Sequence, residues 1–170
     1  MSIRSIAAAL RVTIVATAFT VAAAPVRAEL GGAPMQTPPG AAVNTNARVA
    51  RAASVPPGTS GTPATPSYTV KETTLSSGTV VREYIGQDGA VFGIAWSGPD
   101  APDLSVLLGS YFPSYLDGVK AWRAQGHGRR PIAVEQTGLV VHVGGHMGTY
   151  FGQAYLPQSL PVNVSPGVIR

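Results

Sequence analysis

Two histidines, His142 and His146, stand four residues apart near the end of the chain and are the first candidates for chemistry. Metalloproteases bind zinc through two histidines at this spacing, but there both histidines lie on one face of a helix with a glutamate beside them. In this chain Gly144 and Gly145 separate the histidines, and no glutamate is near. On an extended strand, residues four apart lie ~13 Å from one another, which is too far to share one ion. The sequence therefore predicts no metal site, and we expect both histidines to be structural or to face solvent.

The sequence also lacks the patterns that present a nucleophile. The chain has no cysteine, and no serine lies in the Gly-x-Ser-x-Gly pattern that places a hydrolase nucleophile on a sharp turn. The glycine-rich residues 144–148 are not followed by the Lys-Ser or Lys-Thr pair of a phosphate-binding loop, so a hairpin turn is the simpler interpretation. We predict no catalytic residue and no cofactor.

One enzymatic alternative stays open. His142 or His146 could act as a general base beside a carboxylate such as Glu135. Proton transfer of this kind needs a histidine nitrogen and a carboxylate oxygen within about 3.2 Å of each other in a cleft. That distance is the observation that decides for or against this alternative.

Candidate binding residues come from the aromatic and histidine side chains. A small domain without disulfides needs most of its aromatic residues for the core, but an exposed subset would form a face that binds protein or glycan. The candidates are Trp96, His142, His146 and Tyr150.

The elements that must position these residues begin at Tyr68. Residues 68–75, 79–85 and 91–97 are rich in strand-forming residues, and turn residues separate them, so they predict an antiparallel meander. By the period of two, the large apolar residues of the third segment are expected to share one face: Phe92, Ile94 and Trp96.

Charge predicts the register of the first hairpin. A three-residue turn with Gly78 in the left-handed conformation places Glu72 opposite Arg82 and Lys71 opposite Glu83. A two-residue turn would place Glu72 opposite Glu83, which is a like-charge pair. We therefore prefer the three-residue turn.

A helical segment and three further strands follow. Apolar residues at helical spacing predict a helix over residues 104–125, capped by Asp100 or Asp103 and kinked or divided at Pro113. Strand patterns then cover residues 132–136, 139–143 and 149–156. This order predicts one α+β domain with a small, mostly antiparallel sheet.

The first 28 residues have the features of a secretory signal peptide. Arg4 and Arg11 give a basic start, residues 12–24 are uncharged and apolar, and Val26-Arg27-Ala28 provides small residues for cleavage after Ala28. We therefore expect residues 1–28 to direct export and to be removed.

The remaining boundaries follow from composition. Residues 29–67 are rich in proline, glycine, alanine and threonine, and are expected to form a disordered tether. Residues 68–157 are expected to form the globular domain, and residues 158–170 a C-terminal tail.

Charge and hydropathy exclude two classes of partner. The predicted leader removes three of the 12 Lys and Arg residues and none of the 8 acidic residues, so nine basic residues remain and the net charge falls to +1. The one dense basic patch left is at residues 126–130, which is too little for nucleic-acid binding. No later apolar run approaches the ~18 residues of a spanning helix, so we expect no stable membrane anchor after cleavage.

Several segments together resemble a family of short exported bacterial proteins known as a domain of unknown function, the one numbered 2844. The segments are residues 30–32 (LGG), 68–75 (YTVKETTL), 78–84 (GTVVREY), 91–96 (VFGIAW), 107–112 (LLGSYF) and 144–148 (GGHMG). The resemblance implies export and a compact domain, and it brings no reaction, ligand or site residue with it.

We therefore predict a periplasmic or secreted protein that serves as a non-enzymatic binding or accessory module of the cell envelope. Its partner is expected to be an envelope or secreted protein. The alternative is a small envelope hydrolase or metal-dependent enzyme that uses His142 or His146.

Overall fold

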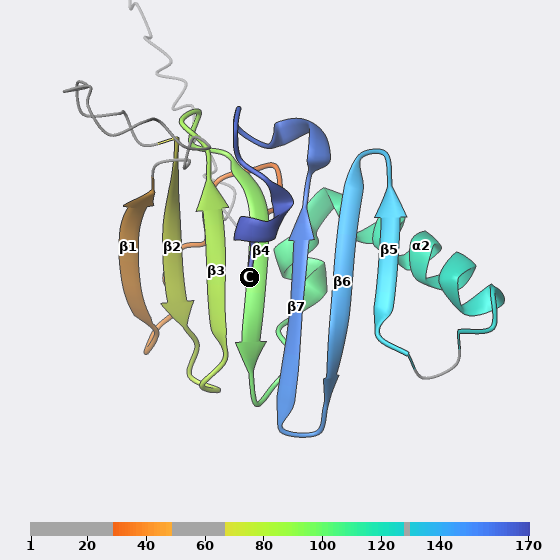
Figure 1. Ribbon diagram of the computed structural model, residues 1–170. Coiled ribbons are helices and arrows are strands. Elements are labelled where there is room, and N and C mark those ends of the chain that lie inside the picture. Colours follow the sequence, from red (N-terminus) through yellow and green to blue (C-terminus); the bar gives the residue numbers. More distant parts are fainter. Residues whose placement is uncertain (1–28, 49–66, 128–129) are drawn as a thin grey trace, which may run out of the picture.

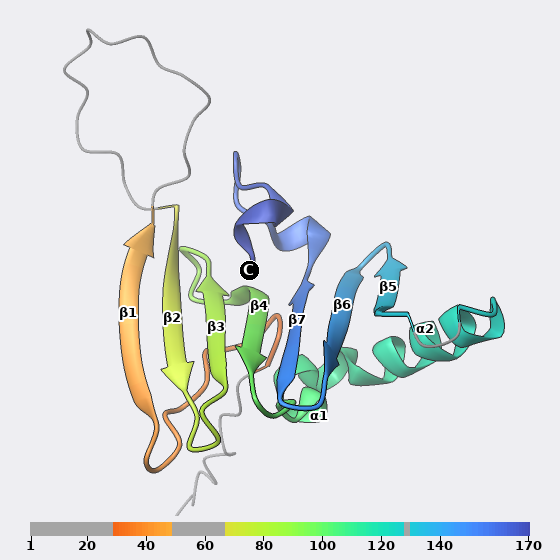
Figure 2. The same ribbon diagram turned by 60° about the horizontal axis from the view of Figure 1, so that its bottom comes forward.

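The computed structural model describes residues 29–48, 67–127 and 130–170, so the predicted leader and residues 49–66 of the predicted tether lie outside the described residues. A seven-stranded antiparallel sheet, of order β1-β2-β3-β4-β7-β6-β5, forms the body of the molecule. A helical segment covers one face of the sheet, and the C-terminal residues cover part of the other (Figures 1 and 2). The strands are β1 (Ala42–Arg48), β2 (Tyr68–Thr74), β3 (Val80–Ile85), β4 (Val91–Gly98), β5 (Ile132–Gln136), β6 (Leu139–His146) and β7 (Thr149–Tyr155). The predicted α+β class with a mostly antiparallel sheet is confirmed.

The β2–β3 hairpin has the register that charge predicted. Glu72 lies opposite Arg82, and Lys71 lies opposite Glu83. Gly78 has φ +84°, the left-handed conformation that the three-residue turn requires. The Arg82 Nε donates to Glu72 Oε2 at 2.7 Å, so the cross-strand pair forms a direct ion pair.

A β-bulge changes the pattern of β4. The register with β3 shifts between Tyr84 and Ile85, so that Tyr84 lies opposite Gly93 while Ile85 lies opposite Val91. The extra residue turns Phe92 to the face opposite Ile94 and Trp96, where it packs with Tyr68 and Tyr84. The expectation that Phe92 shares a face with Ile94 and Trp96 is therefore wrong, because strict alternation fails at a bulge.

The helical segment divides slightly earlier than predicted. It comprises α1 (Leu104–Leu108), the 3₁₀ turn η1 (Gly109–Tyr111) and α2 (Phe112–Ala124). Asp103 caps α1 by accepting the Ser105 N–H at 2.9 Å. Pro113 lies in the first turn of α2, where its missing N–H costs nothing, so the division comes at the turn that precedes it.

The last strand enters the middle of the sheet. The hairpins β5–β6 and β6–β7 bring the chain back so that β7 pairs with β4 on one side and β6 on the other. The helix α2 packs against β5, where the absence of a side chain at Gly118 admits Val134. This packing leaves β5 at the edge of the sheet.

The residues after the predicted cleavage site are part of the fold. We call residues 29–36 the amino-terminal strap. Leu30 is 1% exposed and belongs to the main core between the sheet and the helices. The Gly31 N–H donates to the Val91 carbonyl at 2.8 Å, and the Val91 N–H donates to the Gly32 carbonyl at 2.9 Å. The expectation of a disordered tether is thus corrected for residues 29–48, which form the strap and the edge strand β1.

A buried carboxylate fixes the far end of the strap. Glu83 is fully buried, and its Oε1 accepts the Met35 N–H at 2.7 Å, while no residue that the structure describes forms a hydrogen bond with its Oε2. Lys71 donates to the Met35 carbonyl and lies 3.8 Å from Glu83 Oε2. Burial raises the pKa of Glu83, and the Met35 N–H and the Lys71 ammonium partly oppose that rise.

The C-terminal residues also join the folded unit. Residues 157–170 include the 3₁₀ turns η2 (Pro157–Ser159) and η3 (Pro166–Val168) and cross the face opposite the helices. Val164 and Ile169 are buried in a second cluster with Tyr68, Tyr84 and Phe92. No helix within residues 29–48, 67–127 or 130–170 is long and apolar enough to cross a membrane.

Candidate functional site

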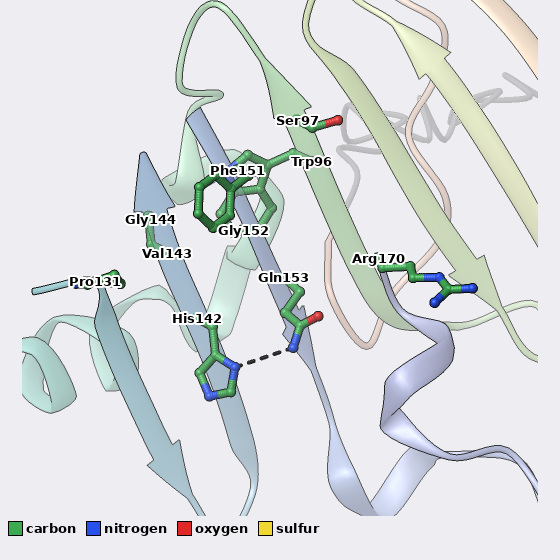
Figure 3. Close-up of a pocket in the computed structure, with 10 residues that line it drawn as sticks. All are labelled: Trp96, Ser97, Pro131, His142, Val143, Gly144, Phe151, Gly152, Gln153 and Arg170. Atoms are coloured by element: carbon green, nitrogen blue, oxygen red, sulfur yellow. Dashed lines mark hydrogen bonds between the residues drawn. The ribbon is translucent and has the colours of Figure 1, made fainter. Parts of the chain in front are cut away.

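Residues 157–170 cover part of one face of the sheet, and a groove lies beside them. The groove has a volume of about 390 Å³ and lies over β4, β7 and β6 (Figure 3). Its lining is mostly apolar and consists of Trp96, Ser97, Pro131, His142, Val143, Gly144, Phe151, Gly152, Gln153 and Arg170. We call this surface the open-face groove.

Strand register decides which side chains meet there. Ser97 lies opposite Phe151, and Phe151 lies opposite Gly144, so these residues form one row across three strands. Gln153 and His142 face each other in the next row. Because directly opposed residues point to the same face of a sheet, the two rows together make the floor and rim of the groove.

Phe151 supplies the largest exposed apolar surface of the groove. A Cβ on Gly144 would lie 2.7 Å from Phe151 Cζ, so the phenyl ring covers the bare backbone of the opposite strand. The ring nevertheless remains 52% exposed. A large aromatic side chain held in place on one side and open to solvent on the other is a feature of binding surfaces.

Trp96, a predicted binding residue, lies beneath the groove rather than in reach of solvent. It is buried in the main core, and its indole lies against the backbone of Gly152. Its contribution is therefore to support the floor from below.

Replacing Gly152 by alanine is expected to lower the free energy of unfolding by about 1–3 kcal/mol, because the added Cβ would overlap Trp96 Cζ2. Urea unfolding followed by tryptophan fluorescence measures this change. Gly138→Ala is the matched control: nothing lies within 4 Å of its added Cβ, so its effect should stay within about 0.5 kcal/mol. Equal effects of the two substitutions would contradict the contact.

His142 is held between two neighbours. Its Nε2 lies 3.2 Å from Glu135 Oε1, and the Gln153 amide nitrogen lies 3.3 Å from its Nδ1 (Figure 3). A neutral imidazole satisfies both contacts if Nε2–H donates to Glu135 and Nδ1 accepts from Gln153. The distance to Glu135 meets the limit set for a histidine–carboxylate pair, but Glu135 is 71% exposed at its side chain and does not line the groove.

The groove does not bring a nucleophile to this histidine. Ser97 is the hydroxyl residue of the lining, and it lies two strands and two positions along the sheet from His142. The spacing of strands and residues puts their Cα atoms roughly 12 Å apart. Gln153 also contacts Nδ1, so among the described residues the groove places no free histidine nitrogen next to a hydroxyl group.

The remaining predicted residues lie elsewhere. β6 continues as a strand from His142 to His146, and His146 is exposed, with its Nδ1 3.1 Å from the Met147 carbonyl oxygen. The two histidines are therefore separated along an extended strand. Tyr150 lies opposite Gly145, on the face of the sheet opposite Phe151. In the part of the chain that the structure describes, no cluster of three or more His, Cys, Asp or Glu residues could hold a metal ion.

Sequence reasoning missed Phe151, Gln153 and Arg170. Phe151 and Gln153 alternate with residues that point to the helix side, and this alternation was visible in the sequence. The face that stays uncovered could not be predicted from the sequence, because it depends on where residues 157–170 lie. The Tyr84 hydroxyl exchanges hydrogen bonds with the backbone N–H and carbonyl of Arg170 and thereby stops the C-terminal residues at the groove's edge.

Comparison with known proteins gives one family match. A family model described as "Protein of unknown function (DUF2844)" matches residues 26–169. Neither the curated proteins nor the solved structures contain a match.

Proposed function

The chain belongs to the DUF2844 family. We propose that it is an exported, non-enzymatic module that binds a protein of the cell envelope through the open-face groove. The proposal places the module in the periplasm or outside the cell. The features of residues 1–28 support export: a basic start, an apolar run and small residues before Glu29.

One observation carries the binding proposal: a half-exposed Phe151 in an apolar groove with polar groups at its rim. Protein interfaces depend on a few aromatic anchors that are surrounded by groups able to donate and accept hydrogen bonds. Phe151 is such an anchor, and Gln153 and Arg170 border the same groove. The ring packs on Gly144 on one side, and its other side is open to a partner.

A photocrosslinking amino acid at position 151 tests the proposal in the producing cell. We expect a discrete crosslinked product with an envelope protein from position 151. Position 116 is the matched control, since Leu116 is also a large exposed hydrophobic residue, 42% exposed, but lies on the outer side of α2. The proposal fails if position 151 yields no product, or if position 116 yields the same product in the same amount.

The contact between His142 and Glu135 favours a second candidate function, a small envelope hydrolase or metal-dependent enzyme. It would use His142 as a base oriented by Glu135, which requires Gln153 to move away from the His142 Nδ1. The same crosslinking experiment separates the two. A binding module keeps its product when Glu135 is replaced by alanine, because Glu135 does not line the groove, whereas an enzyme that processes its partner changes the amount of product.

A further inference from the structure

The strand β5 forms one edge of the sheet, and its outer side is open for pairing. The described residues place β6 beside β5 on one side and no strand on the other. A two-residue turn joins the two strands, and Gln136 lies opposite Leu139 across it. The residues that flank such a turn hydrogen-bond to each other, and the pattern then alternates along the strand. The backbone N–H and C=O groups of Ala133 and Glu135 therefore point away from β6.

A groove runs along this open edge. It has a volume of about 400 Å³; α2 contributes Gly118, Ala121 and Trp122 to its lining, and β5 contributes residues 133–136. The side chains of the two outward-facing β5 residues lie on the face of the sheet opposite α2, the face that carries His142. It is therefore their backbone that borders the groove. We call this surface the edge groove.

The helix α2 continues beyond the edge of the sheet. Its first turns lie beneath β5, where the Gln136 amide nitrogen is 3.4 Å from the Ser114 carbonyl oxygen and Gly118 packs on Val134. Its C-terminal half extends past β5 (Figures 1 and 2). Trp122 lies on this half and is only partly buried. A strand added to β5 would therefore have α2 beneath it, as β5 itself does.

The sequence of β5 does little to prevent such pairing. Edge strands are commonly protected by a lysine, a proline or a β-bulge. Residues 132–136 contain neither lysine nor proline, and they pair with β6 without a register shift. The one charge of the strand is Glu135, whose side chain is 71% exposed. Because opposite charges stabilise a cross-strand pair, a strand that pairs with β5 should carry a basic residue opposite Glu135.

We propose that β5 binds an extended peptide segment of a partner protein, which adds as a further strand antiparallel to β5 and occupies the edge groove. Main-chain hydrogen bonds to Ala133 and Glu135 supply affinity, and a basic side chain opposite Glu135 supplies charge complementarity. Alternate apolar side chains of the peptide point to α2, which presents two small residues and one indole.

A second copy of the chain fits this edge less well than a peptide does. An antiparallel pair of two β5 strands would bring both α2 helices to the same side of the sheet, where each already extends past its own β5. A single peptide strand brings no helix with it. The edge groove shares no lining residue with the open-face groove, so the inference does not depend on the function proposed above.

The test is an NMR titration of the isotopically labelled full chain with a six-residue probe, acetyl-Thr-Val-Lys-Val-Thr-Val-amide. In the proposed register the probe's lysine lies opposite Glu135 and its second threonine opposite Ala133, so the N–H groups of both point to β5. We expect saturable shifts of the β5 amide signals. N-methylation of the lysine should weaken binding at least about tenfold, whereas N-methylation of the next valine, whose N–H points to solvent, should weaken it less than about threefold.

Two substitutions on α2 check where the probe binds. Ala121→Trp fills the edge groove and should abolish binding, whereas Ala124→Trp, at a position that is equally exposed but outside the groove lining, should leave binding unchanged. The inference is overturned if the probe causes no saturable shift at millimolar concentration, if the shifts centre on Phe151, or if the two N-methylated probes bind alike. A dimer of the chain that Ala121→Trp dissociates in sedimentation would overturn it in favour of pairing between two copies.

Discussion

Replacing Leu30 by alanine is expected to lower the free energy of unfolding by about 2–5 kcal/mol, the cost of removing a fully buried leucine. The composition of residues 29–67 predicts no effect at all, because a disordered tether has no contacts to lose. The side chain nevertheless lies in the main core with Leu107, Leu108 and Leu156. Chemical denaturation of a chain beginning at Glu29 measures the difference.

Leu116→Ala is the matched control for this substitution. Leu116 is 42% exposed on α2, so truncating it should change the free energy of unfolding by less than about 1 kcal/mol. If Leu30→Ala were as mild as Leu116→Ala, the strap would not be part of the core.

Replacing Lys71 by methionine is expected to lower the free energy of unfolding by on the order of 3 kcal/mol at neutral pH. The substitution leaves the buried Glu83 carboxylate without the cation that pairs with it and the Met35 carbonyl without its lysine donor. Burial of a charge is costly unless the charge is paired, and the Oε2 of Glu83 has no hydrogen bond to compensate. Urea unfolding at pH 7 and at pH 4 gives the free energies.

The decrease in the free energy of unfolding that Lys71→Met causes should be smaller at pH 4 than at pH 7, because folding raises the pKa of Glu83. A group whose pKa is raised by folding contributes stability that is fully present below its unfolded value, 4.5, and that is lost as the pH rises through the folded value. At pH 4 Glu83 is therefore protonated and needs no cation. Glu83→Gln should abolish this pH dependence, because the amide stays neutral throughout.

Lys120→Met controls for the general effect of removing a lysine. Lys120 pairs with Asp117 on the exposed side of α2, where ion pairs contribute little. Its effect should stay within about 0.5 kcal/mol at both pH values. An equal loss for Lys71→Met at pH 4 and pH 7 would show that Glu83 is not the group that Lys71 stabilises.

The strap and the open-face groove lie on opposite faces of the sheet, and each depends on where a terminal segment lies. The strap covers the helix side of β2 and β3 through Met35, while residues 164–170 cover the other side of the same strands. Together the two segments cover both faces at this end of the sheet and leave Phe151 uncovered at the other. Within the described residues neither segment covers Phe151, so the proposed binding surface is open beside them.

Local chemistry made several elements predictable from the sequence alone. Opposite charges at Glu72 and Arg82 fixed the hairpin register, Asp103 marked the start of α1, and residues 132–136 form β5 as the pattern indicated. Each of these depends on residues that are near one another in the chain, so the relevant energies are already present in a short segment.

The tertiary structure decided everything that depends on distant partners. Val91 accepts and donates hydrogen bonds with Gly31 and Gly32, sixty residues away in a segment whose composition is that of a linker. The bulge at Phe92 and the insertion of β7 beside β4 likewise follow from packing between elements rather than from any local pattern. The groove around Phe151 lies beside residues 157–170, and a contact between residues 84 and 170 holds that segment in place on the sheet.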